Sequence, residues 1–200
     1  MNSWQRTITF CKLAKISKMT THLALLRGIN VSGHNIIKMN DIKLMLEKIG
    51  FVNVVTYIQS GNVFITSLVE NQNEVGFIIQ KEIFKTFGHE VPVVVIAKKD
   101  LEDCLKYNSF LSVSNIDSKK LYVAFLSKLL DSQAINDLKP SQFKPDEVQI
   151  HENKIFIKYE IGAGKTKFDQ KYIEKKLNLV ATIRNWNSIN ILLDLYRQFD

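Results

Sequence analysis

A long polar loop follows the first apolar segment of the chain, and its residue types suit the binding of an anion. The segment LLRGINVSGHNIIKMND, residues 25–41, places Arg27 and Gly28 directly after two leucines and then continues with polar side chains. Most connections between a strand and a helix take two to six residues, so a loop of this length is typical of a functional site. A guanidinium can hold a carboxylate or phosphate through two parallel hydrogen bonds, and the free N–H groups of a helix start favour the same ligand.

A second polar stretch, QSGN at 59–62, forms a tight turn between two predicted strands and adds further amide groups. Glycines in both stretches permit positive φ and a close approach of the backbone to a ligand. Two features have a purely structural interpretation, since Gly61 and Asn62 can simply make a hairpin turn and Asn40 can simply cap a helix. We accept those roles and still favour a ligand site for the loop. The candidate ligand-binding residues of this first cluster are Arg27, Gly28, Asn30, Gly33, Asn35, Lys38, Tyr57, Gln59, Ser60 and Asn62.

The segment GAGKTK at 162–167 is a further candidate for binding an anion. It resembles the end of a phosphate-binding loop, GxxxxGK[ST], but the first glycine of that motif falls on Tyr159, so the motif fails. A looser anion site is still possible, built from Lys165 and the N–H groups at the start of the following helix. The alternative is that Thr166 merely caps that helix.

The segment RNWN at 184–187 ends a predicted strand and begins the last helix, which Asn187 or Ser188 can cap. Arg184 at this strand end is best explained by a carboxylate or phosphate partner, which an internal group can also supply. Trp186 can serve as a platform for a ligand, although packing in the core is the commoner role of tryptophan. With Lys165, the candidate binding residues of this second cluster are Arg184, Asn185 and Trp186.

Recognisable catalytic and metal-binding patterns are missing from the sequence. It contains no GxSxG or HExxH motif, and its four histidines are scattered without metal-ligand spacing. His34 is the one group in either cluster that titrates near neutral pH, which makes it a weak candidate for a general base. A solvated loop histidine is the simpler interpretation. The sequence therefore predicts no metal and no cofactor, and it leaves open whether the protein is an enzyme.

Composition indicates an ordinary globular protein, with 46% hydrophobic and 24% charged residues. The longest apolar run covers 91–97, far short of the roughly twenty residues needed to cross a bilayer. Cys11 and Cys104 lie far apart, which fits a reducing cytoplasm. Residues 1–18 carry four basic and no acidic residues, so they account for four of the seven net positive charges. We expect a disordered or weakly ordered extension ahead of Met19 there, with a targeting peptide as the less favoured alternative.

The spacing of apolar residues predicts an α+β fold built from two successive strand–helix–strand–strand–helix–strand units. Pro92 cannot donate a hydrogen bond to a neighbouring strand, so its strand should lie at the edge of a sheet. These units are expected to be two ferredoxin-like subdomains in tandem, over 19–98 and 99–200, with linking and C-terminal helices in the second. The predicted strands are 22–27, 52–59, 63–67, 91–97, 120–127, a hairpin turning at Glu152–Asn153, and 180–185. The predicted helices are 41–49, 72–87, 99–107, 131–138, 168–177 and one starting at 189.

This topology predicts where the polar segments lie relative to one another. In such a unit the loop after the first strand and the hairpin between the second and third strands share one pole. Residues 27–38 and 59–62 are therefore expected to meet, and 162–167 and 184–187 are expected to share the opposite pole.

Three segments resemble an uncharacterised bacterial family, domain of unknown function 1697: ALLRGINVSGHNIIKM, GFVNVVTYIQSGNVFITS and EKKLNLVATIRNWNSINILLDL. The resemblance runs from residue 19 to about 197 and implies a cytoplasmic protein with a two-lobed, ferredoxin-like α+β fold and no established activity. The chain departs from the family pattern at His34 and at GKTK. The matching motif residues are Arg27, Gly28, Asn30, Val31, Gly33, Tyr57, Gln59, Ser60, Gly61, Asn62, Arg184, Asn185 and Trp186.

Two functions of different classes fit these features. The first is the binding of a small anionic or phosphorylated ligand by the Gly-rich polar loops. The second is an RNA-binding module that uses the face of a ferredoxin-like sheet, with Phe156 between Lys154 and Lys158 on one face and Tyr122 beside them. We prefer the first, because residues 19–200 hold 23 basic and 20 acidic residues, a net charge of only +3. No membrane partner is expected, and the oligomeric state is left open.

Overall fold

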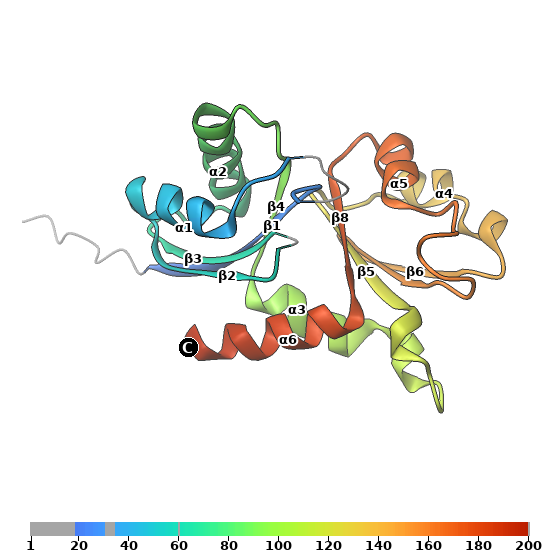
Figure 1. Ribbon diagram of the computed structural model, residues 1–200. Helices are drawn as coiled ribbons and strands as arrows, with labels where there is room; N and C mark the ends of the chain where they lie inside the picture. Colours follow the sequence, from blue (N-terminus) through green and yellow to red (C-terminus); the bar gives the residue numbers. More distant parts are fainter. Residues whose placement is uncertain (1–18, 31–34, 60, 200) are drawn as a thin grey trace, which may run out of the picture.

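The computed structural model describes residues 19–30, 35–59 and 61–199, so the N-terminal extension and four residues of the first loop lie outside the described chain. Within the described residues there are two four-stranded antiparallel sheets and six α-helices (Figure 1). The fold is therefore α+β. None of these helices is long and apolar enough to span a membrane.

The first half contains one sheet with the strand order β2-β3-β1-β4. The central strands β1 and β3 are almost completely buried. The strand β4 lies at the edge directly after Pro92, as the proline predicts. Gly88 ends α2 in the left-handed conformation that glycine adopts without strain. The elements are β1 (Thr20–Leu26), α1 (Met39–Lys48), β2 (Val52–Tyr57), β3 (Asn62–Ser67), α2 (Gln72–Phe87) and β4 (Val93–Ile96).

The second half repeats this order of elements in a sheet with the strand order β6-β7-β5-β8. It follows α3 (Lys98–Tyr107) and precedes α6 (Trp186–Tyr196). Its elements are β5 (Leu121–Leu126), α4 (Ser132–Asp137), β6 (Glu147–His151), β7 (Lys154–Lys158), α5 (Gln170–Leu177) and β8 (Ala181–Asn185). Short 3-10 segments cover Ser109–Ser112, Ser118–Lys120, Pro140–Phe143 and Arg197–Phe199.

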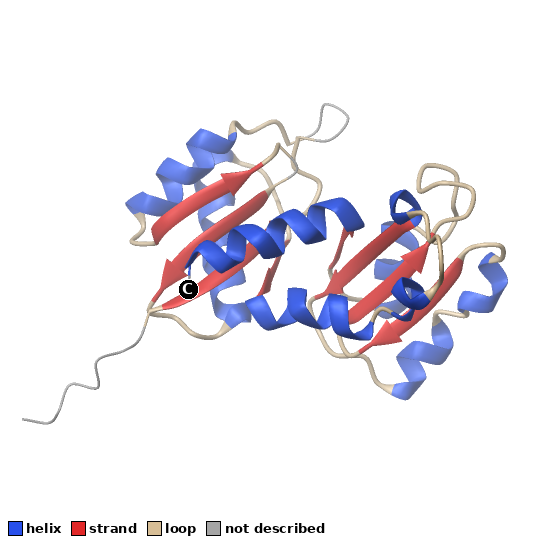
Figure 2. Ribbon diagram, turned by 90° about the horizontal axis from the view of Figure 1, so that it is seen from below, coloured by secondary structure: helices blue, strands red, loops and turns tan. Residues whose placement is uncertain are grey.

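Helices cover both faces of both sheets. Helices α1 and α2 pack on one face of the first sheet, and α4 and α5 pack on one face of the second (Figure 1). The opposite faces of the two sheets share a third core with α3 and α6, which run across both halves (Figure 2). Burying one continuous apolar cluster under two shared helices is what joins the halves.

This arrangement removes the sheet face that the RNA-binding alternative requires. Phe156 is completely buried in the core shared with α3 and α6, and Lys154 is completely buried as well. Tyr122 does not lie beside them, because it pairs with Ile157 while Val123 pairs with Phe156, so its side chain is on the opposite face. The prediction of an exposed aromatic row is therefore wrong.

The starts of three helices differ from the sequence-based expectation. Lys38, rather than Asn40, occupies the N-cap position of α1. Asn185 caps α6 by accepting a hydrogen bond from the Ser188 N–H at 2.8 Å, which displaces the expected caps Asn187 and Ser188 into the helix. Likewise Asp169, not Thr166, caps α5. Several neighbouring residues have the chemistry of a cap, so composition alone does not choose among them.

Candidate functional site

The first loop and the β2–β3 hairpin lie together, as the topology predicts. The Asn30 side chain donates to the Gln59 carbonyl at 3.1 Å, and the Leu26 N–H donates to the Gly61 carbonyl at 2.7 Å. The same Asn30 amide bonds both backbone groups of Ile37, and the Asn35 side chain bonds the Gly28 carbonyl. These amide side chains therefore hold the loop in shape.

Arg27 has an internal partner in this structure. Its Nη2 donates to Oε2 of Glu174 on α5 at 2.6 Å, and the two side chains are 30% and 17% exposed. The other oxygen of Glu174 accepts from the Ala181 N–H at 3.0 Å, which fixes the carboxylate. The sequence predicts a bound anion for Arg27, but any such anion has to compete with a carboxylate of the second half.

Arg184 joins the first cluster instead of the opposite pole. It lies on β8 and donates to Asn62 Oδ1 at 2.7 Å and to the carbonyls of Leu26 and Gly61 at 3.2 and 3.4 Å. It also donates to Thr182 Oγ1 at 2.7 Å. Burial lowers the pKa of Arg184 to about 10, so the side chain is still charged at neutral pH. These partners of Arg184 are therefore internal, but they are amide, carbonyl and hydroxyl oxygens rather than the carboxylate or phosphate expected from the sequence. These hydrogen bonds clamp the first half onto the second.

The other residues of the second cluster have structural roles or lie exposed. Asn185 is the cap of α6, and Trp186 is 5% exposed in the shared core. Lys165 is exposed in a loop built on Asp146, which accepts from the Thr166 hydroxyl at 2.6 Å and from the Glu160 N–H at 2.8 Å.

The remaining candidates of the first cluster contribute less. Lys38 is exposed, Tyr57 contributes its carbonyl to Asn62, and Gly28 is exposed. Gly33, His34 and Ser60 lie outside the described residues.

A cleft between the two halves was not predicted from the sequence. It has a volume of about 470 Å³ and is lined by the first turns of α2, by β4 and α3, by the end of β5 and by the β6–β7 turn. That volume falls within the range of roughly 300–1,000 Å³ typical of sites for small molecules. Its wall is apolar along Val95, Leu126 and Val180, while Asp100 and Glu152 supply carboxylates at one end.

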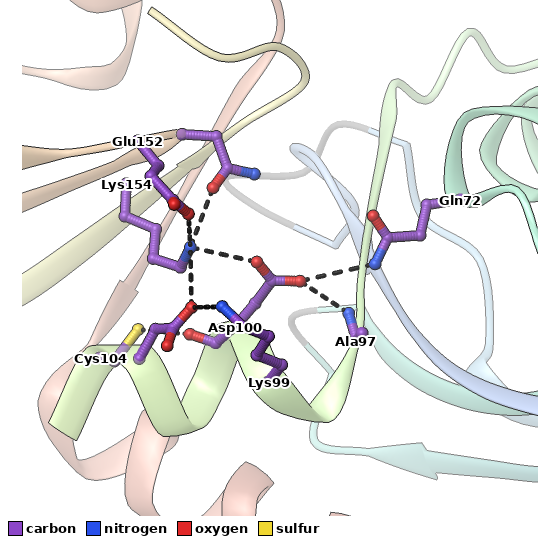
Figure 3. Close-up of polar contacts among 9 residues, drawn as sticks. Gln72, Ala97, Lys99, Asp100, Cys104, Glu152 and Lys154 are labelled. Carbon is purple, nitrogen blue, oxygen red and sulfur yellow. Dashed lines mark hydrogen bonds and ion pairs between the residues drawn. The ribbon is translucent and has the colours of Figure 1, made fainter. Parts of the chain in front are cut away.

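A completely buried lysine lies behind the acidic end of the cleft (Figure 3). Lys154 Nζ lies 3.1 Å from Asp100 Oδ1 and 3.0 Å from Asn153 Oδ1. Its distances to the nearest carboxylate oxygens of Asp103 and Glu152 are both 3.8 Å. A buried ammonium group is tolerated only when it is paired and hydrogen-bonded, so these contacts explain why lysine can begin the buried strand β7.

Asp100 is the centre of this cluster and connects the two halves. One oxygen pairs with Lys154, and the other accepts from the Ala97 N–H at 2.9 Å and from Gln72 Nε2 at 3.5 Å. Three contacts from α2, α3 and β7 therefore fix the orientation of this carboxylate (Figure 3). By contrast, the side chain of Glu152 is 52% exposed and is free to turn toward the cleft.

Cys104 lies on the next turn of α3 but cannot serve as a nucleophile here. Its thiol donates to the Asp100 carbonyl at 3.1 Å, and burial raises its pKa far above neutral pH. A thiolate is the reactive form, so the thiol is inert in this state. Among the described residues no group of three or more His, Cys, Asp and Glu side chains is arranged to hold a metal ion.

Comparisons with known proteins agree with this fold and name no activity. A conserved bacterial protein, SP0830 from Streptococcus pneumoniae, has a solved structure that matches 90% of this chain and 99% of its own with a TM-score of 0.69. At 23% identity this similarity concerns the fold alone. No curated protein matches the chain. A family model described as "Protein of unknown function (DUF1697)" matches residues 19–156, and the chain therefore belongs to that family.

Proposed function

We propose that this protein binds a small ligand in the cleft between its two halves. The observation that carries the proposal is the cleft itself, where the Asp100 carboxylate is fixed from three sides and lies in the same lining as Val95, Leu126 and Val180. The lining combines several polar side chains with an apolar strip, so it suits a ligand that carries both polar and apolar groups. Asp100 is held before any ligand arrives, so binding loses little entropy in ordering it.

The chemistry of the lining favours a ligand with an amino group attached to an apolar body. Glu152 and Asp100 accept hydrogen bonds or pair with a cation at one end, and Val95, Leu126 and Val180 line the wall. Lys128 also lines the cleft, so a carboxylate on the ligand has a partner. A ligand of this class differs from the anionic ligand predicted from the Gly-rich loops.

The anionic ligand at the first loop is the second candidate, and one observation favours it. The Nε atom of Arg27 is buried without a hydrogen-bond partner among the described groups, so the guanidinium retains donor capacity after pairing with Glu174. Against it stands the carboxylate of Glu174, which any anion would have to displace or share.

Nuclear magnetic resonance with three matched compounds distinguishes the two sites. Phenethylamine, 3-phenylpropionate and phenyl phosphate share a ring and differ in charge. We expect phenethylamine to shift the backbone amide signals of Ser127 and Asn153, which line the cleft. Glu152→Gln should weaken that binding about fivefold, because a half-exposed ion pair contributes about 1 kcal/mol.

The control variant is Glu47→Gln, which removes an exposed carboxylate of α1 far from the cleft lining and should leave the affinity unchanged. Phenyl phosphate that perturbs the signals of Gly28 and Asn30, and loses that effect in Arg27→Ala, would support the anionic site instead. A chain that binds none of the three compounds would contradict the proposal.

The proposal keeps three expectations from the sequence. We infer that residues 19–98 and 99–200 are two ferredoxin-like subdomains, and the repeated order of elements with matching strand orders supports this. A cytoplasmic location is supported by the unpaired, buried thiol of Cys104. Catalysis is not part of the proposal.

A further inference from the structure

We propose that single-stranded nucleic acid binds on a lysine-rich surface around α5. This surface is separate from the cleft and from the buried sheet faces. We call this surface the α5 face. It is defined by five exposed lysines around two aromatic rings: Lys139, Lys144, Lys171, Lys175 and Lys176, with Phe143 and Tyr172.

The net charge of residues 19–200 is concentrated in the segment 161–180, which contains three of the five lysines of this surface, Lys171, Lys175 and Lys176. Residues 19–200 hold 23 basic and 20 acidic residues, and residues 161–180 alone hold five lysines and two acids. The rest of 19–200 therefore contains 18 of each sign and is neutral. Of the two acids in 161–180, Glu174 is paired with Arg27 and Asp169 caps α5. Little negative charge is left to neutralise the lysines.

The lysines of the α5 face are also unpaired within the described chain. None of the five forms an ion pair with a described carboxylate, whereas six other lysines do, namely Lys43, Lys85, Lys99, Lys120, Lys154 and Lys158. Asp137, which lies two residues before Lys139, accepts a hydrogen bond from Gln133 instead. A group of unpaired lysines attracts a polyanion, and binding releases the counterions of the polyanion.

Aromatic rings lie among these lysines. The rings of Phe143 and Tyr172 are 4.7 Å apart, and both side chains are half-buried. Lys139 and Lys144 flank the 3-10 segment that carries Phe143, while Lys176 Nζ lies 5.8 Å from the centre of the Tyr172 ring. The Tyr172 hydroxyl donates to the Leu138 carbonyl at 3.0 Å, which holds the ring in place. Basic side chains interleaved with fixed aromatic rings are the combination that binds single strands.

The apolar side of α5 argues against a membrane as the partner. Ile173 is completely buried, and no residue of α5 is among the large hydrophobic side chains exposed on the described surface. A helix that binds lipid needs an exposed apolar stripe to insert. The α5 face offers ammonium groups and two half-buried aromatic rings, which suit phosphates and bases.

Fluorescence anisotropy of a labelled oligo-dT strand with the full chain tests the proposal. If all five lysines contact phosphates, the slope of log affinity against log salt should be about −3.5, given about 0.7 per contact on a single strand. Lys171→Gln, Lys175→Gln and Lys176→Gln combined should bring the slope to about −1.4. The matched control combines Lys48→Gln, Lys81→Gln and Lys85→Gln, which remove the same charge from exposed sites on α1 and α2 and should change the slope little.

A second comparison separates nucleic acid from other polyanions. Stacking of one base on an aromatic ring contributes roughly 1–3 kcal/mol, so oligo-dT should bind about tenfold or more tighter than inorganic polyphosphate of equal charge. Equal slopes in the two triple variants would overturn the proposal, since binding would then follow total charge or residues 1–18. Equal affinity for polyphosphate or polyglutamate, or tighter binding to vesicles of anionic lipid, would overturn it in favour of another partner.

Discussion

Removing the Arg184 guanidinium should cost the protein a large part of its stability. Arg184→Met keeps an unbranched side chain of similar length but loses every hydrogen bond that the guanidinium donates. In the structure those bonds reach Asn62, Leu26 and Gly61 in the first half as well as Thr182 on β8 itself. The substitution therefore removes buried hydrogen bonds that join the two halves.

The expected loss follows from the burial of these partners. Taking the donor from a buried acceptor costs about 1–3 kcal/mol, so losing the charged donor of Asn62 Oδ1 and of the Leu26 carbonyl together should cost about 2–6 kcal/mol. The Oδ1 atom of Asn62 belongs to a residue with no exposed surface, so water cannot replace Arg184 there. Arg184→Lys should lose less stability than Arg184→Met, because lysine keeps the positive charge. It should still be less stable than the natural chain, because an ammonium group lacks the planar fork that bonds several acceptors at once.

Equilibrium unfolding in urea provides the measurement. With a slope of about 2.5 kcal/mol per molar urea, a loss of 4 kcal/mol lowers the midpoint by about 1.6 M. Arg197→Met is the matched control, because Arg197 is 57% exposed and its pair with Asp194 should contribute less than about 1 kcal/mol. A double-mutant cycle with Asn62→Ala should give a coupling of about 1–3 kcal/mol. A loss below about 1 kcal/mol for Arg184→Met, or no coupling to Asn62, would refute the clamp.

Three further outcomes are expected. Lys154→Met should lower the free energy of unfolding by about 3–5 kcal/mol in urea titrations, because it leaves buried carboxylates uncompensated, and a neutral result would contradict the ion cluster. Gly61→Ala should reduce the melting temperature, since a Cβ there would lie 2.5 Å from Ile29 Cγ2 at a φ of +78°, and an unchanged melting temperature would contradict that crowding. Burial lowers the pKa of His22, so the unfolded state takes up its proton first and stability should fall as pH drops below about 6.5. His22→Gln should lose less stability than the natural chain between neutral pH and pH 5, and parallel curves would contradict this role.

Local structure could be predicted from the sequence because its causes are local. Apolar periodicity located the strands and helices, Pro92 placed β4 at an edge, and the order of elements brought the first loop to the β2–β3 hairpin. Trp186 also lies in the core, as the commoner role of tryptophan suggests. The start of α6 could not be predicted from the sequence, because Asn185, Asn187 and Ser188 all have the chemistry of a helix cap.

The partners of the charged residues could not be predicted, because they depend on how the halves pack. Arg27 finds Glu174, which lies 147 positions away, and Arg184 finds Asn62 across 122 positions. The alternation of residues along 154–158 suggests that Lys154 and Phe156 lie on an exposed sheet face. This pattern cannot reveal that α3 covers that face. The cleft is made by the same packing, so no segment of the sequence contains its pattern.

A crystal structure of the protein soaked with phenethylamine tests the central claim most directly. The cleft account predicts the ring against Val95 and Leu126, with the ammonium group within hydrogen-bond distance of Glu152 or Asp100. An empty cleft in crystals where the compound is bound at the first loop, or nowhere on the protein, would contradict it.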